Sequence, residues 1–248
     1  MRYRATLAYD GSAYQGFQRQ AGDIPTVQRS IEQALVAVTG QEAGVIAAGR
    51  TDSGVHATGQ VIAFDVTWRH DPDALLRALN VNLPQDIALQ SIREHPGFHP
   101  RFDAQSRHYE YTLLRSDQRQ PLLRNHAWWI PHPLDVEVMQ HCAALLIGEH
   151  DFATFGPSPQ GDNTVRTVFV SEWSQVAESD GNRLCYRIEG NAFLQHMVRR
   201  IVGMLVAVGR GMRSAADFES AFRSADIAQA KSMAPPQGLV LVAVTYRD

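Results

Sequence analysis

The sequence predicts an α+β protein made of two halves, each with the element order β-α-β-β-α-β of ferredoxin-like folds. Segments with strand-like alternation and segments with helical spacing follow one another in this order over residues 2–92. The same order returns over residues 107–246, with one extra helix. We expect mainly antiparallel sheets side by side with an active-site groove between the halves, and we place the domains at residues 1–104 and 105–248.

The first half begins with Arg2–Tyr9, where polar and apolar residues alternate as in a strand. A helix is predicted from Thr26 to Gly40, because apolar residues recur at helical spacing between a capping residue and a glycine. Two extended pieces come next, Gly44–Ala48 and Gln60–Val66. A helix that begins with Asp71 and Pro72 and a strand at Asp86–Ile92 complete the first half. The glycine-bracketed loop Gly49–Gly59 is unusually long for a connection between strands.

The second half follows a predicted boundary region at His95–Pro100, which is rich in turn-forming residues. Its predicted elements, in order, are strand Arg107–Arg115, helix Asp135–Ile147 closed by Gly148, strands Val165–Trp173 and Arg183–Glu189, the apolar helix Phe193–Val208, a short helix capped by Ser214, and strand Leu239–Tyr246.

The composition is that of an ordinary globular protein, with 248 residues, of which 44% are apolar and 20% are charged. No apolar run is long enough for a membrane helix, and the first residues lack the apolar core of a signal peptide, so we expect a cytoplasmic protein. Cys142 and Cys185 have no metal-ligand spacing, and the histidines form no HExxH pattern. We therefore expect neither a disulfide nor a metal site.

The net charge of −3 does not by itself suggest a nucleic-acid binder, but basic residues cluster along the chain. Arg101 and Arg107 stand close to Tyr109, and His196 and Arg199 lie three positions apart on one predicted helix face. These side chains are candidates for phosphate contacts. Solvated faces and surface salt bridges are the alternative interpretation, and charge alone does not decide between them.

The segment Gly49-Arg50-Thr51-Asp52-Ser53-Gly54-Val55-His56 places one carboxylate between glycines, where the backbone can turn tightly and approach a ligand. Taken alone, Asp52 is better explained by a turn that its side chain stabilises. Arg50 stands two positions earlier, so in extended backbone both side chains point to the same side. In a sheltered cleft Arg50 would keep Asp52 ionised, as a carboxylate nucleophile or base must be.

This segment resembles the GRTDxGVH signature of the tRNA pseudouridine synthase A family. Further segments of the chain are similar to that family in the same order: Tyr9-Asp10-Gly11 with Gly16-Phe17-Gln18-Arg19-Gln20, Asn80–Pro84, Phe98–Phe102, Arg107–Tyr111, Asn191–Arg199 and Gly238–Val242. The resemblance covers nearly the whole chain, and seven ordered similarities are not expected by chance.

The resemblance implies the pseudouridine synthase fold and an enzyme that isomerises uridine in tRNA without metal or cofactor. Asp52 corresponds to the essential aspartate, Arg50 to its arginine partner and Tyr109 to the tyrosine that packs against the target uracil. Positions 38 to 40 of the anticodon stem-loop and a homodimer are also implied. The sequence leaves open whether Asp52 attacks C1′ of the ribose, attacks C6 of the base or removes the C2′ proton.

Two rival interpretations depend on other features. Split βαβ halves also occur in RNA-binding modules without catalysis, although the RNP1 pattern is absent and the loop around Asp52 would have no purpose there. A hydrolase or transferase with an aspartyl nucleophile is the second rival, and no phosphate-binding glycine motif accompanies it.

Overall fold

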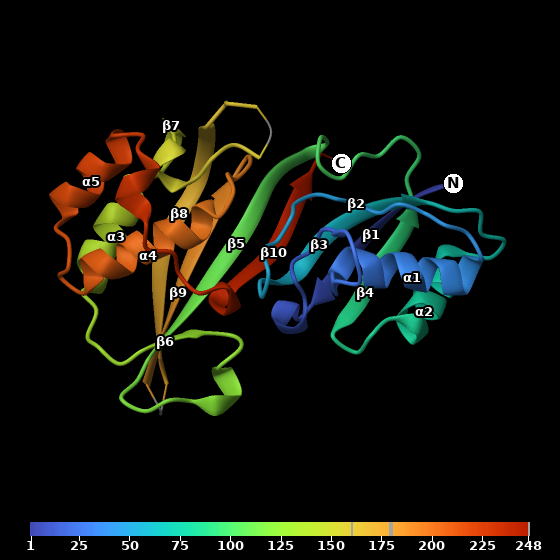
Figure 1. Ribbon diagram of the computed structural model, residues 1–248, viewed down its shortest axis with the longest axis horizontal. Coiled ribbons are helices and arrows are strands. Elements are labelled where there is room, and N and C mark those ends of the chain that lie inside the picture. The colour runs from blue at the N-terminus through green and yellow to red at the C-terminus, as the bar shows by residue number, and fades with distance from the viewer. Residues whose placement is uncertain (160, 179–180, 248) are drawn as a thin grey trace. The chain divides into compact units, whose positions relative to one another are not determined.

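The chain folds into two compact units in a computed structural model that describes residues 1–159, 161–178 and 181–247. The first unit comprises Met1–Gln105 and Val240–Asp248, and the second comprises Ser106–Leu239. Figure 1 labels the helices and strands of both units. Within the described residues, no helix combines the length and the apolar character needed to cross a membrane.

The first unit contains a mostly antiparallel sheet in the order β4-β1-β3-β10. Strand β1 (Arg2–Tyr9) pairs antiparallel with β3 (His56–Asp65) and with β4 (Ile87–Glu94). The short β2 (Ile46–Ala47) pairs antiparallel with β3, whereas β10 (Leu239–Tyr246) pairs with β3 in parallel. The element order β-α-β-β-α-β over the first 94 residues agrees with the sequence prediction.

Two amphipathic helices cover the core of the first unit, and they contact each other (Figure 1). Helix α1 (Val27–Thr39) begins after Thr26, whose side chain accepts from the Arg29 N–H, and ends at Gly40 in the left-handed conformation. Helix α2 (Pro72–Asn82) begins after Asp71, which caps the Ala74 N–H. Both starts were predicted, because capping signals are local in sequence.

The second unit contains the strand order β5-β9-β8-β7, and every pair along it is antiparallel. These strands are β5 (Ala104–Arg115), β7 (Gly148–Asp151), β8 (Val165–Glu178) and β9 (Gly181–Gly190), with β6 (Trp128–Ile130) added in parallel to β5. Strands β6 and β7 were not predicted, since each is too short to show a period.

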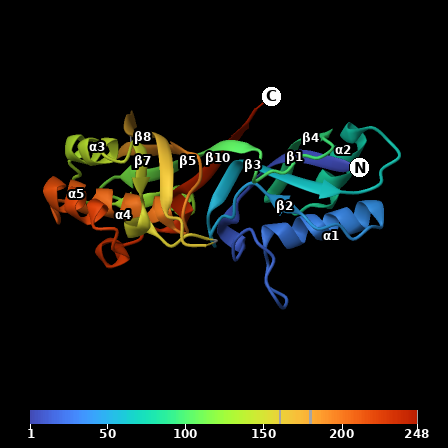
Figure 2. The same ribbon diagram turned by 90° about the horizontal axis from the view of Figure 1, so that it is seen from above.

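Three helices form one layer of the second unit, and Figure 2 shows them side by side. They are α3 (Val136–Ala144), α4 (Met197–Gly209) and α5 (Ala215–Arg223), and Ser214 begins α5 with a reciprocal capping box. Short 3-10 turns occur at Gly11–Ala13, Pro121–Leu123, Ala153–Phe155, Ile227–Ala230 and Pro236–Gly238.

Three further differences from the sequence prediction have causes that are distant in the sequence or lie in the backbone. Strand β3 begins at His56, four residues before the predicted start, because β10 pairs with it at His56 and Ala57. Strand β10 packs in the first unit, so the observed units differ at the C-terminus from the predicted residues 1–104 and 105–248. Helix α4 begins at Met197 and not at Phe193, since His196 is left-handed and interrupts the helix there.

Gly59 permits the close approach of β10 to β3. A Cβ atom at Gly59 would lie 2.0 Å from the carbonyl oxygen of Val242, whereas a Cβ atom at Gly44 would have no neighbour within 4 Å. We therefore expect Gly59→Ala to lower the free energy of unfolding by about 1 to 3 kcal/mol. Urea unfolding measures the loss, and Gly44→Ala is the matched control. Equal unfolding free energies for the two variants would contradict this account of the pairing.

Candidate active site

The Asp52 loop, residues 49–55, connects β2 to β3 and turns sharply at its centre. The N–H of Val55 donates to the carbonyl of Asp52 at 3.1 Å, and Gly54 has a φ of 76°. Asp52 is therefore the first residue of a tight turn whose third position requires positive φ, which glycine adopts without strain. The Asp52 side chain is half-buried, and Arg50 is exposed. The predicted pairing of Arg50 with Asp52 stays a prediction.

The supporting segment, residues 9–17, holds the Asp52 loop through its backbone. The N–H of Phe17 donates to the carbonyl of Thr51 at 3.0 Å, and the N–H of Gly54 donates to the carbonyl of Tyr14 at 3.4 Å. The hydroxyl of Ser53 also donates to the carbonyl of Tyr14, at 3.2 Å. The residues on both sides of Asp52 are thus hydrogen-bonded to one other segment, which restricts the position of the carboxylate.

Two glycines of the supporting segment make this approach possible. A Cβ atom at Gly11 would lie 2.0 Å from the carbonyl oxygen of Val55, and a Cβ atom at Gly16 would lie 2.9 Å from that of Thr51. Gly16 also has a φ of 90°, which other residues rarely adopt. The glycines of the Tyr9-Asp10-Gly11 and Gly16-Phe17 motifs are therefore explained by contact with the Asp52 loop.

Buried side chains fix the start of the same loop. The hydroxyls of Tyr9 and Thr51 are 2.8 Å apart, and the Gln60 amide donates to the carbonyl of Gly49 at 2.8 Å. Burial raises the pKa of Tyr9 to about 12, against the opposing effect of hydrogen bonds with Thr51 and Gln60. Tyr9 is therefore a neutral hydroxyl at physiological pH, and its contribution is to position Thr51, one residue before Asp52.

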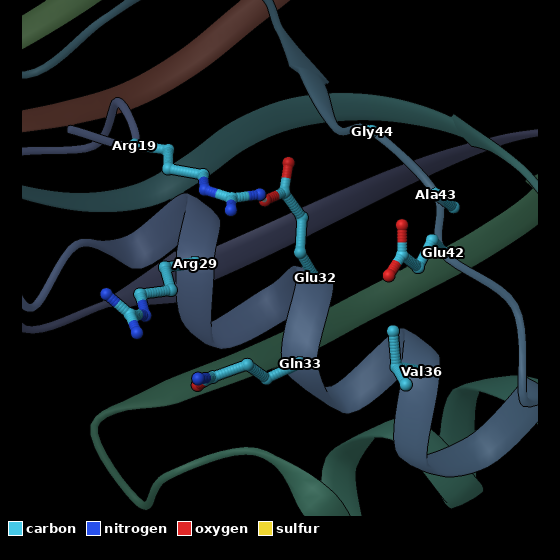
Figure 3. Close-up of a pocket in the computed structure, with 8 residues that line it drawn as sticks. All are labelled: Arg19, Arg29, Glu32, Gln33, Val36, Glu42, Ala43 and Gly44. Atoms are coloured by element: carbon cyan, nitrogen blue, oxygen red, sulfur yellow. Dashed lines mark hydrogen bonds and ion pairs between the residues drawn. The ribbon is translucent and has the colours of Figure 1, made fainter. Parts of the chain in front are cut away.

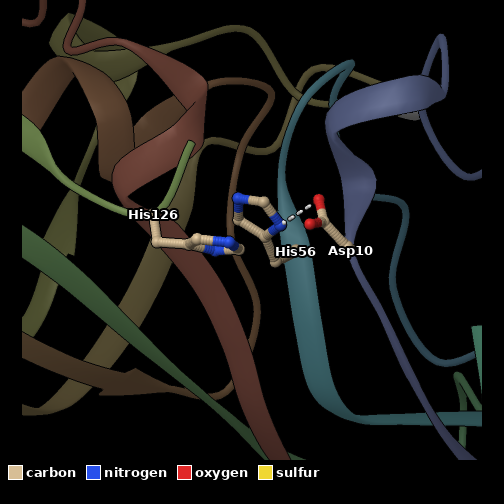
Figure 4. A group of neighbouring side chains, drawn as sticks. All are labelled: Asp10, His56 and His126. Carbon is tan, nitrogen blue, oxygen red and sulfur yellow. Dashed lines mark ion pairs between the residues drawn. The ribbon is translucent and has the colours of Figure 1, made fainter. Parts of the chain in front are cut away.

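The end of the loop is held by His56, which is buried (Figure 4). Its Nδ1 atom lies 3.1 Å from the backbone nitrogen of Gly11 and 3.1 Å from Oδ1 of Asp10. A neutral imidazole accepts from the Gly11 N–H through this nitrogen, and a protonated one donates to Asp10. In either state His56 ties the first motif of the chain to the last residue of the Asp52 signature.

In the second unit, the predicted substrate residues bring two other motifs together. Tyr109 on β5 packs edge to face against Phe193, with ring centres 5.2 Å apart. Arg107, also on β5, donates through Nη1 to the carbonyl of Asn191 at 2.7 Å. The Arg107–Tyr111 motif is thus in contact with the Asn191–Arg199 motif. Sequence reasoning missed Phe193, because its position next to Tyr109 depends on this long-range contact.

Arg199 and His196 follow in the same segment. Arg199 is only 8% exposed, and its Nε donates to the carbonyl of Ala234 at 2.9 Å. His196 is half-buried and stands at the N-cap of α4 with a φ of 61°. A left-handed residue other than glycine costs about 1 to 3 kcal/mol, and such strain is concentrated at functional sites. Arg101, in contrast, is exposed on the connection between β4 and β5.

A surface hollow beside α1 is a separate feature of the first unit (Figure 3). Its lining residues are Arg19, Arg29, Glu32, Gln33, Val36, Glu42, Ala43 and Gly44. Arg19 pairs with Glu32 at 3.3 Å, and Arg29 pairs with Asp23. Because both arginines are neutralised by carboxylates, the hollow presents little charge to an anionic ligand, and the Asp52 loop remains the better candidate.

The chain is similar in sequence to known proteins over nearly its whole length. A family model described as tRNA pseudouridine synthase matches residues 5–103 and 142–247. The chain belongs to the tRNA pseudouridine synthase family. It is 43% identical to the tRNA pseudouridine synthase A of Neisseria gonorrhoeae over an alignment of 247 residues. The alignment covers 99% of this chain and 92% of that protein. The tRNA pseudouridine synthase A of Pseudothermotoga lettingae is 41% identical and is covered to 99%, as is this chain.

Membership of the tRNA pseudouridine synthase family confirms the resemblance seen in the sequence and makes the chain an isomerase. Among solved structures, a Cbf5-Nop10-Gar1 complex matches 82% of this chain and 45% of that chain, with 13% identity and a TM-score of 0.35. That likeness is too low to support an argument.

The contact between the hydroxyls of Tyr9 and Thr51 can be tested by mutation of Tyr9. Tyr9→Phe leaves the buried Thr51 hydroxyl without this partner, which costs about 1 to 3 kcal/mol of stability. We also expect turnover to fall by roughly tenfold or more, because small displacements of a reacting group are costly.

Tyr186→Phe is the matched control, since the buried Tyr186 hydroxyl lies 2.7 Å from that of Ser171 in the second unit. Urea unfolding and steady-state turnover are measured for both variants. The control should lose stability and keep its turnover. Equal turnover losses in the two variants would contradict a specific role of Tyr9 in supporting the Asp52 loop.

Proposed function

We propose that this chain converts uridine to pseudouridine at positions 38 to 40 of the tRNA anticodon stem-loop, with the Asp52 carboxylate as its catalytic group. The reaction breaks the bond from C1′ to N1 and forms a bond from C1′ to C5. The hydrogen of C5 leaves to solvent and N1 gains a proton, so no net oxidation occurs. The proposed enzyme requires neither metal nor cofactor, and cytoplasmic tRNA is the proposed substrate.

The observation that carries this proposal is the backbone support of the Asp52 loop. Thr51, Ser53 and Gly54 are each hydrogen-bonded to the supporting segment. A catalytic carboxylate must be held within a fraction of an ångström of its productive position, and rigid support on both sides of Asp52 meets that requirement. A turn-forming aspartate with a purely local role would not need two close glycine contacts from a distant segment.

Arg50 is proposed to act with Asp52 when substrate covers the loop. Two opposite charges 4 Å apart attract by about 4 kcal/mol at an effective dielectric near 20, but by only about 1 kcal/mol in water. Arg50 is exposed in this structure, so its pairing with Asp52 gains most of its strength once bound RNA excludes water. Under that condition Arg50 favours the ionised form of Asp52.

Tyr109 is proposed to stack on the extruded uracil. Removing a base from its helical stack costs a few kcal/mol, and stacking on an aromatic ring returns about 1 to 3 kcal/mol. Tyr109 is 8% exposed and its ring packs edge to face against Phe193, which fixes the plane of the ring before a base arrives. A preorganised ring loses little conformational entropy on binding.

The remaining basic residues have different proposed roles in tRNA binding. Arg101 is exposed and suits direct contact with a phosphate. Arg107 and Arg199 donate to the carbonyls of Asn191 and Ala234, so their proposed contribution is to order the segment that presents His196 to the RNA. The family resemblance also supports a homodimer that binds tRNA.

Asp52→Asn tests the proposal, because it keeps the shape of the side chain and removes its charge. We expect pseudouridine formation to fall below detection, since attack on C1′, attack on C6 and removal of the C2′ proton all require the carboxylate. Release of tritium from tRNA that carries 5-tritiated uridine measures the reaction. Binding of tRNA should be retained.

Asp65→Asn is the matched control, because it makes the same change in net charge at an exposed position whose partner is Arg2. The control should turn over at the wild-type rate. An Asp52→Asn enzyme that still releases tritium would refute the assignment. A wild-type protein that binds tRNA without releasing tritium would favour the non-catalytic RNA-binding module, and one that does neither would favour an enzyme for small substrates.

A further inference from the structure

Phe102 is a solvent-exposed aromatic residue on an ordered connection between two strands. It lies between β4 and β5 in the first unit and is 73% exposed, whereas Phe98, four residues earlier, is buried. Exposure of a phenyl ring gives up the stabilisation that burial would provide. The backbone of this connection is ordered, and yet the ring of Phe102 is exposed to solvent.

Hydrogen bonds of His99 fix the backbone on which Phe102 stands. The Nδ1 atom of His99 accepts from the N–H groups of Arg101 and Phe102, each at 3.2 Å. The His99 N–H donates to the carboxylate of Asp103 at 2.8 Å, and the Asp103 N–H donates to the carbonyl of His99 at 3.0 Å. The residues from His99 to Asp103 thus form a closed, internally bonded turn.

The other side of this turn is anchored to the core of the first unit. The guanidinium of Arg4 lies 4.2 Å from the ring centre of Tyr246 and 5.0 Å from that of Phe98. The Tyr246 hydroxyl donates to the carbonyl of Pro100 at 2.8 Å. The position of the turn is therefore determined on one side, while Phe102 is presented on the other.

The surroundings of the Phe102 ring match nucleotide chemistry. The His99 ring is stacked on it with centres 4.1 Å apart and an interplanar angle of 25°, so one face is covered and the high exposure belongs to the rest of the ring. The guanidinium of Arg101 lies over the ring, 6.0 Å from its centre. An exposed ring together with a cation suits a nucleotide, because bases stack on aromatic rings and a guanidinium attracts the phosphate.

We propose that Phe102, stacked on His99 and next to Arg101, is a platform for an unstacked nucleotide of the bound tRNA, distinct from the uridine that is isomerised. The proposal rests on the proposed function in that tRNA is the substrate. Bases inside a duplex expose no face, so the nucleotide must come from a loop or from a disrupted pair. The neighbours Arg101, Asp103 and Gln105 are exposed and polar, whereas the centre of a protein interface is depleted of charged residues.

The test is tRNA binding by Phe102 variants, measured by anisotropy of a labelled tRNA transcript. Phe102→Ala should weaken binding by roughly 5- to 150-fold, since a base stacked on an aromatic ring is worth about 1 to 3 kcal/mol. Phe102→Trp should restore it, and its added indole emission should be quenched by tRNA. Val81→Ala, which shortens another exposed apolar side chain in this unit, should bind as wild type does.

Salt dependence separates the ring from its cationic neighbour. Phe102→Ala should leave the slope of log Kd against log salt concentration unchanged, because a neutral ring releases no counterion, whereas Arg101→Ala should reduce the slope by about 0.7 to 0.9. Wild-type affinity of Phe102→Ala together with unquenched Phe102→Trp emission would overturn the proposal. So would a Phe102→Ala protein whose free form sediments as a smaller species, which would place the ring between copies of the chain. A wild-type protein that neither binds tRNA nor forms pseudouridine would refute the proposed function itself.

Discussion

The close approach of two backbones in the first unit is the constraint on which the candidate active site depends. The supporting segment contacts the Asp52 loop so closely that side chains at Gly11 and Gly16 would collide with carbonyl oxygens of the loop. Hydrogen bonds then hold the residues around Asp52 through main-chain atoms, which have less freedom than side chains. Two sequence motifs more than thirty residues apart form one structural element, and this element explains how a short glycine-rich loop could hold the carboxylate that we propose as catalytic.

The second unit follows the same principle with side chains in place of glycines. Arg107 bonds to the backbone of Asn191, and the ring of Tyr109 packs against Phe193, so two motifs separated by most of that unit meet. The strained backbone of His196 lies at the end of the same segment. In both units, the candidate site residues found in the sequence are held in position by neighbouring residues. The chain belongs to the tRNA pseudouridine synthase family, so uridine isomerisation in tRNA is the reaction that we propose for these restricted groups.

Features with local causes were predicted well from the sequence. The ends of α1 at Thr26 and Gly40 and the start of α2 at Asp71 agree with the structure, because capping involves residues within one turn. Features with long-range causes were not. The early start of β3 at His56 depends on a strand near the C-terminus, and the support of Thr51 by a tyrosine hydroxyl depends on β1. The sequence identified the loop and its aspartate, while the means of holding them became visible only in the fold.

The central claim is that contact with the supporting segment positions Asp52 for catalysis. The most direct measurement is pseudouridine formation by the Gly11→Ala variant, in protein shown to be folded by circular dichroism. The added methyl group displaces the carbonyl of Val55 and leaves the Asp52 side chain itself unchanged. The account predicts that turnover falls roughly a hundredfold while tRNA still binds. Wild-type turnover by folded Gly11→Ala protein would contradict it.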